Sequence, residues 1–107
     1  MAEHAVIVRF DYGSKDLAPL FEVEEQLEAA VEAAGAGEYD GNEIAVDGSD
    51  GFLYLYGPDA DRLYAAIEDV LGGATCLKNA VATLRYGPPE DGVPQVQVKV
   101  GERRKPS

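Results

Sequence analysis

Residues 42–56 constrain the fold of this chain more than any other segment. Two runs of alternating apolar residues meet there across Asp47, two glycines and two polar residues at positions 47–51. Alternation is the period of a β-strand, while Asp and Gly supply the positive-φ positions of a tight turn. The segment therefore predicts a β-hairpin.

Amphipathic helical patterns flank this hairpin, and a further strand is expected beyond each of them. The first strand alternates around Val6, Val8 and Phe10, and residues 37–42 are interpreted as a polar connection. The other expected elements are a helix from Leu17 or Pro19 to Ala34 with Ser14 or Asp16 as N-cap, a helix opened by Gly57-Pro58-Asp59 and ended by Gly72-Gly73, a fourth strand within 77–86, and a fifth strand carrying Val96, Val98 and Val100.

This element order predicts an α+β fold, the ferredoxin-like βαββαβ sandwich with an extra C-terminal strand. Right-handed crossovers give an antiparallel sheet of spatial order 4-1-3-2 with both helices on one face. We expect the fifth strand to pair beside the fourth. Residues 1–101 are predicted to form a single domain, and residues 102–107 a disordered polar tail.

The net charge of −11 is the strongest signal in the composition. Nucleic acids and anionic membranes are disfavoured as partners, because binding to them requires clustered Lys and Arg. A basic protein partner is compatible with this charge. The lone Cys76 allows no internal disulfide, and no run of apolar residues reaches the length of a signal peptide or a membrane span, so we expect a cytoplasmic protein. The Ala, Gly, Val, Asp and Glu content suggests a bacterial source.

An aromatic sheet face is the main candidate for function. If Leu53 and Leu55 face the helices, the aromatic side chains of the same strand project onto the open side of the sheet. The predicted interaction face consists of Ile7, Phe52, Tyr54 and Tyr56. Such a patch approaches the size at which a surface is expected to be covered. Its cover could be a second copy in a homodimer, which we favour, a partner protein, the loop at Pro88-Pro89 or the tail, or RNA.

Residues that could support catalysis are few. The only histidine, His4, lies at an expected frayed end, and Cys76 is interpreted as a small core residue. The acidic residues around the hairpin do not fit a calcium loop. We therefore expect no enzyme activity, no catalytic residues, no metal site and no cofactor.

Two resemblances add to this interpretation. Residues 38–44 and 54–61 resemble segments of small uncharacterised bacterial proteins of ferredoxin-like fold, which have no assigned activity. The same topology is shared by the amino-acid-binding regulatory modules called ACT domains, whose ligand loop reads Asp-x-x-Gly-x-Leu. Residues 11–17 contain the same residue types at a different spacing. This similarity implies a ligand site near Asp11, Gly13 and Ser14.

The sequence thus leads to two functional hypotheses. The first is a non-enzymatic protein-interaction module, dimeric through the aromatic face. In a sharper form it is an acidic inhibitor of a basic partner, such as an immunity protein of a secreted nuclease toxin. The alternative is a small-molecule-binding regulatory module of ACT-like topology.

Overall fold

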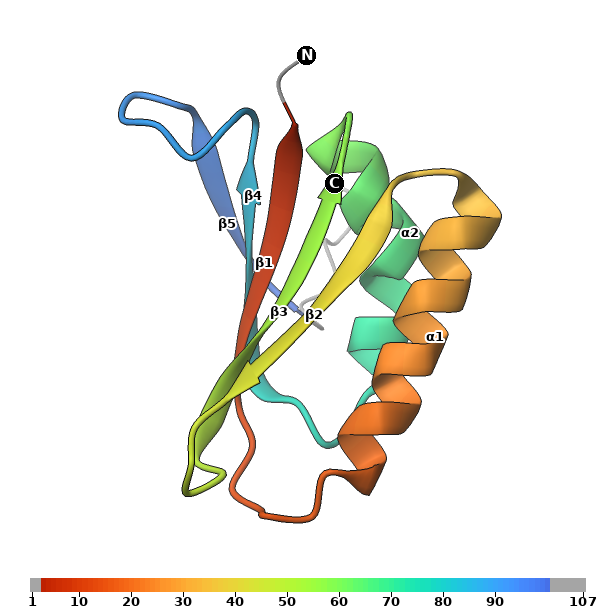
Figure 1. Cartoon of the computed structure of the whole chain (residues 1–107), viewed down its shortest axis with the longest axis vertical. Coiled ribbons are helices and arrows are strands. Elements are labelled where there is room, and N and C mark those ends of the chain that lie inside the picture. Colours follow the sequence, from red (N-terminus) through yellow and green to blue (C-terminus); the bar gives the residue numbers. More distant parts are fainter. Residues whose placement is uncertain (1–2, 101–107) are drawn as a thin grey trace, which may run out of the picture.

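A computed structural model describes residues 3–100 of the chain, so the predicted tail at 102–107 lies outside the described residues. The fold is α+β, with one antiparallel five-stranded sheet and two helices (Figure 1). The elements are β1 (His4–Asp11), α1 (Ala18–Ala34), β2 (Glu38–Ile44), β3 (Asp50–Gly57), α2 (Ala60–Gly73), β4 (Lys78–Arg85) and β5 (Gln95–Lys99).

The strand order is β2-β3-β1-β4-β5, which is the order expected from the sequence. Every neighbouring pair is antiparallel. Both helices pack on the same side of the sheet, as Figure 1 shows, and no helix of residues 3–100 covers the other side, which we call the open face. The position of β3 between β1 and β2 makes it a central strand with two different faces.

The hairpin of β2 and β3 is confirmed, but β2 begins earlier than predicted. Residues 38–42 belong to the strand and are not a connection. A bulge between Tyr39 and Gly41 and the positive φ of Gly41, 128°, break the alternation that would have revealed it. Val46, expected within the strand, lies in the turn and is fully exposed.

The two helices start differently. Asp59 caps α2 as its sequence indicates, because its Oδ1 accepts from the backbone N–H groups of Asp61 (3.0 Å) and Arg62 (3.4 Å). The N-cap of α1 is Leu17 and not Ser14 or Asp16. The Asp16 carboxylate still accepts from the N–H of Ala18 at 3.1 Å, so it satisfies a donor of the first turn from one position further out.

The only histidine is held in the structure and is not at a frayed end. His4 Nδ1 accepts from the N–H of Ala60 at 3.0 Å, at the start of α2. Its ring also meets Tyr86 edge-on, with 5.8 Å between ring centroids, and the Tyr86 hydroxyl donates to Asp61 at 2.6 Å. His4 therefore joins the end of β4 to the first turn of α2.

The core lies between the helices and one face of the sheet. The strand positions that face the helices alternate strictly along β3, where Leu53 and Leu55 are fully buried. The facing of β4, ambiguous in the sequence, is settled by Ala80, Ala82 and Leu84, which lie on the core side. The largest fully buried side chains are Phe10, Leu20, Leu27, Leu53, Leu55, Leu63, Ile67, Leu71, Val6, Val8 and Val31.

Truncation of Leu55 should destabilise the fold strongly, because its side chain is fully buried in the central strand. We expect Leu55→Ala to lower the free energy of unfolding by about 2–5 kcal/mol, measured by urea denaturation. Val46→Ala is the matched control, since Val46 is fully exposed, and its effect should stay within about 0.5 kcal/mol. Equal effects of the two substitutions would contradict the proposed core.

Candidate functional site

The open face of the sheet, on the side away from the helices, brings the four predicted interaction residues together. Phe52, Tyr54 and Tyr56 alternate with the buried residues of β3, and each is partly exposed. Ile7 of β1 is the direct cross-strand neighbour of Tyr54 and is partly exposed as well. The rings of Phe52 and Tyr54 stack at an interplanar angle of 20°, with 6.2 Å between centroids. These four residues form the aromatic centre of the open face.

Charged residues flank this centre on both sides. Arg9 lies beside Phe52 in the register, and its guanidinium pairs with Asp50 at 3.2 Å and with Asp11 at 3.6 Å. Arg85 of β4 shares the open face with Arg9. These arginines were not singled out from the sequence, because their distance from the aromatic residues depends on a register that spans most of the chain.

Glu43 of β2 fixes the position of the Tyr54 hydroxyl. The hydroxyl donates to the Glu43 Oε1 atom on the same side of the sheet. This hydrogen bond, burial and the negative charges nearby raise the pKa of Tyr54 to about 12 from its ordinary value of 10.0. The bond favours the protonated phenol, so it holds a neutral donor and a carboxylate at the centre of the open face.

The second predicted site, the loop after β1, is occupied by contacts within the chain. The N–H groups of Gly13 and Ser14 donate to the carbonyl oxygen of Gly48 at 2.7 and 3.2 Å. The Asp11 carboxylate accepts from Asn79 at 3.0 Å, and Ser14 Oγ accepts from the N–H of Asp16. The loop thus braces the β2–β3 turn, and a small-molecule site there stays a prediction.

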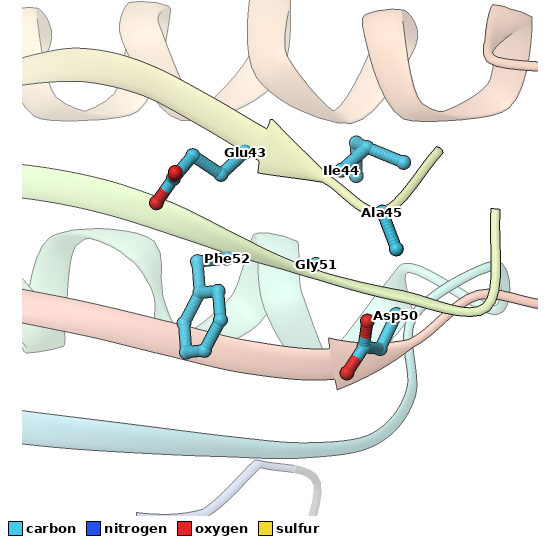
Figure 2. A pocket seen from close by; sticks show the side chains of 6 residues that line it. All are labelled: Glu43, Ile44, Ala45, Asp50, Gly51 and Phe52. Atoms are coloured by element: carbon cyan, nitrogen blue, oxygen red, sulfur yellow. The ribbon is translucent and has the colours of Figure 1, made fainter. Parts of the chain in front are cut away.

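A shallow hollow of about 210 Å³ lies at the turn end of the β2–β3 hairpin. Figure 2 shows its lining residues: Glu43, Ile44, Ala45, Asp50, Gly51 and Phe52. The carboxylates of Glu43 and Asp50 point the same way as the Phe52 ring, whereas Ile44 packs against the core. The hollow is therefore the edge of the open face, at the point where the aromatic centre meets carboxylates.

The polar segment at 40–43 divides between the two faces of the sheet. Asn42 turns toward α1, where its amide donates to Glu24, while Glu43 reaches Tyr54 on the open face. Burial of the Tyr39 side chain and the negative charge of Glu24 raise the pKa of Tyr39. The segment holds an edge strand against a helix on one side and supplies a carboxylate on the other.

The β4–β5 loop was one candidate cover for the open face. Figure 1 shows this loop extending past the ends of the two strands. It is closed on itself by a hydrogen bond from the N–H of Tyr86 to the carbonyl of Pro94 at 3.0 Å, and the Val93 side chain approaches Gly87 so closely that an added Cβ would lie 3.1 Å from its Cγ1. Phe52, Tyr54 and Tyr56 remain partly exposed.

The Tyr54–Glu43 bond predicts a distinct alkaline titration. The pKa of Tyr54 should be about 12 in the folded protein, and Glu43→Gln should move it toward 10.0. Both values can be measured by titrating the ¹³Cζ resonances of the tyrosines. Because the folded pKa lies above the unfolded one, the stability from this bond is complete below about pH 10 and is lost as the pH rises toward 12. Glu25→Gln on α1 is the control. An unchanged Tyr54 titration in Glu43→Gln would contradict the contact.

The contact between the two turns predicts that Gly48 cannot carry a side chain. A Cβ atom there would lie 2.1 Å from the Ser14 carbonyl oxygen, and φ is 73°. Gly48→Ala should lower the free energy of unfolding by at least about 1 kcal/mol in urea denaturation. Gly72→Ala is the control, since that position lies in α2 with open space around it, and it should stabilise by up to about 1 kcal/mol. A neutral Gly48→Ala would show that the loop is free for another role.

Within residues 3–100, no group of three or more His, Cys, Asp or Glu side chains is arranged to hold a metal ion. Neither helix of that part of the chain is long and apolar enough to cross a membrane. Comparisons with known protein families, with curated proteins and with solved structures find no match to this chain. A function must therefore be argued from the geometry of the open face itself.

Proposed function

We propose that this protein is a non-enzymatic protein-interaction module of ferredoxin-like fold, cytoplasmic and homodimeric through the open face of its sheet. The strand order and the placement of both helices on one side support the fold assignment. The observation that supports this function is the aromatic centre of the open face, whose side chains are partly exposed in the structure of residues 3–100.

The composition of the open face is typical of a protein–protein interface. Aromatic side chains and arginines are the residue types that contribute most to protein–protein binding. Here Phe52 lies between Arg9 and Glu43 in the register, and Tyr54 stacks on Phe52, so apolar area and both signs of charge occur together. A second copy of the chain presents the same mixture and can satisfy both signs.

A second candidate is an acidic inhibitor that binds a basic protein. It is favoured by the net charge of −11 and by the outer side of α1, where four glutamates are exposed: Glu22, Glu25, Glu28 and Glu32. This surface lies on the helix layer, on the other side of the molecule from the open face. The two functions can therefore be tested separately.

Salt should distinguish the two modes of association. Two copies that each carry −11 repel one another, so screening by salt should strengthen self-association through an apolar face. A complex with a basic protein should weaken with salt, because electrostatic steering is lost. Co-purification at 50 and 500 mM salt, together with sedimentation of the isolated protein, measures both trends. A basic partner retained equally at both salt concentrations would contradict the inhibitor hypothesis.

A charge at the centre of the open face should abolish the dimer. Tyr54→Glu would bury two unpaired carboxylates at a symmetric interface and should give a monomer in light scattering. Phe21→Glu is the matched control, because Phe21 is an aromatic residue 53% exposed on α1 and should leave the dimer intact. Dimerisation of Tyr54→Glu, or a wild-type protein that is already monomeric, would contradict the proposal.

A further inference from the structure

One row of the open face carries opposite charges at its two ends. One row of the register across four strands reads Glu38 on β2, Tyr56 on β3, Ala5 on β1 and Arg85 on β4. An acidic group thus lies beside the largest side chain of the row, and a basic group lies beside the smallest.

The next two rows have the same kind of asymmetry about the line between β3 and β1. Tyr54 is opposite Ile7, and Phe52 is opposite Arg9. In each row β3 therefore contributes an aromatic ring, whereas β1 contributes a smaller or a cationic side chain.

We propose that the occupant of the open face is a second copy of this chain, related by a two-fold axis that runs parallel to the strands between β1 and β3. The proposal rests on the proposed function and adds the arrangement of the two copies. This rotation lays β1 of one copy over β3 of the other and β4 over β2. Tyr56 then lies over Ala5, which is already buried within its own copy, Tyr54 covers Ile7, and Phe52 lies under the Arg9 guanidinium.

The charges in the row of Glu38 favour this axis over its alternative. In the row of Asp11 and Asp50, which the rotation also superposes, Arg9 is paired with both carboxylates. The strand-parallel axis places Glu38 of each copy against Arg85 of the other, which forms two equivalent ion pairs. An axis perpendicular to the strands would stack β2 on β2 and bring Glu38 against Glu43, since the row of Glu43 lies on the other side of the central row. Like charges across an interface are strongly unfavourable.

Neither charge of this pair is neutralised within its own copy. The ion pairs of the described residues involve Arg9 alone, with Asp11 and Asp50. Arg85 donates through Nε to the carbonyl of Gly87 at 2.9 Å. Glu38 lies three strand spacings away from it, about 14 Å, so the two side chains can meet only between copies.

Charge reversal tests the arrangement in a way that a folding defect cannot imitate. Glu38→Arg and Arg85→Glu should each weaken the dimer about tenfold or more in sedimentation, because two attractive pairs become repulsive. A 1:1 mixture of the two variants should form a heterodimer of wild-type affinity, since both pairs are then restored. Glu25→Arg and Arg62→Glu on the helices change the net charge equally and should not alter the dissociation constant.

The outcomes separate this inference from the proposed function. Suppose that Tyr54→Glu disrupts the dimer, but that the mixture shows no recovery or that Glu38→Arg tightens binding. The open face would then remain the interface, and the strand-parallel axis would be overturned. A dimer indifferent to Tyr54→Glu, or a wild-type monomer at all concentrations, would overturn both. Recovery of wild-type affinity in the mixture of Glu38→Arg and Arg85→Glu, but in neither variant by itself, would establish the intermolecular Glu38–Arg85 contact.

Discussion

The two-sided character of β3 is the constraint on which the rest of the structure depends. Both helices pack on one side of the sheet, so this central strand must bury Leu53 and Leu55 beneath them. Strict alternation then sends three aromatic side chains to the other side. The open face is thus a direct consequence of how the core is filled, and any slip by one residue would exchange the two sets.

The surroundings of the aromatic centre follow from pairing in the sheet. The neighbours of β3 are β2, which supplies carboxylates, and β1, which supplies Ile7 and Arg9. The turn of the β2–β3 hairpin is braced by the loop after β1 through the Gly48 carbonyl, which fixes the end of the hairpin relative to β1. Polar contacts within the chain thereby position a mixed aromatic and charged surface.

Much of this architecture could be predicted from the sequence because its signals are local. The hairpin turn, the cap at Asp59 and the alternation of β3 each occupy a few consecutive residues. The start of β2 was missed because an edge strand with a bulge between Tyr39 and Gly41 needs no apolar alternation. The structural role of His4 was also missed, since its acceptor contact is with Ala60, 56 residues away. The four aromatic-face residues were predicted, whereas the charged residues around them depend on register between distant strands.

Self-association through the open face can be tested most directly with isotope-filtered NOE spectroscopy on a 1:1 mixture of ¹³C-labelled and unlabelled protein. The Ile7 methyl groups of labelled molecules should show cross-peaks to the Tyr54 ring protons of unlabelled ones. The absence of intermolecular cross-peaks at a concentration where sedimentation shows a dimer, or cross-peaks from residues of α1 and α2 alone, would contradict an interface on the open face.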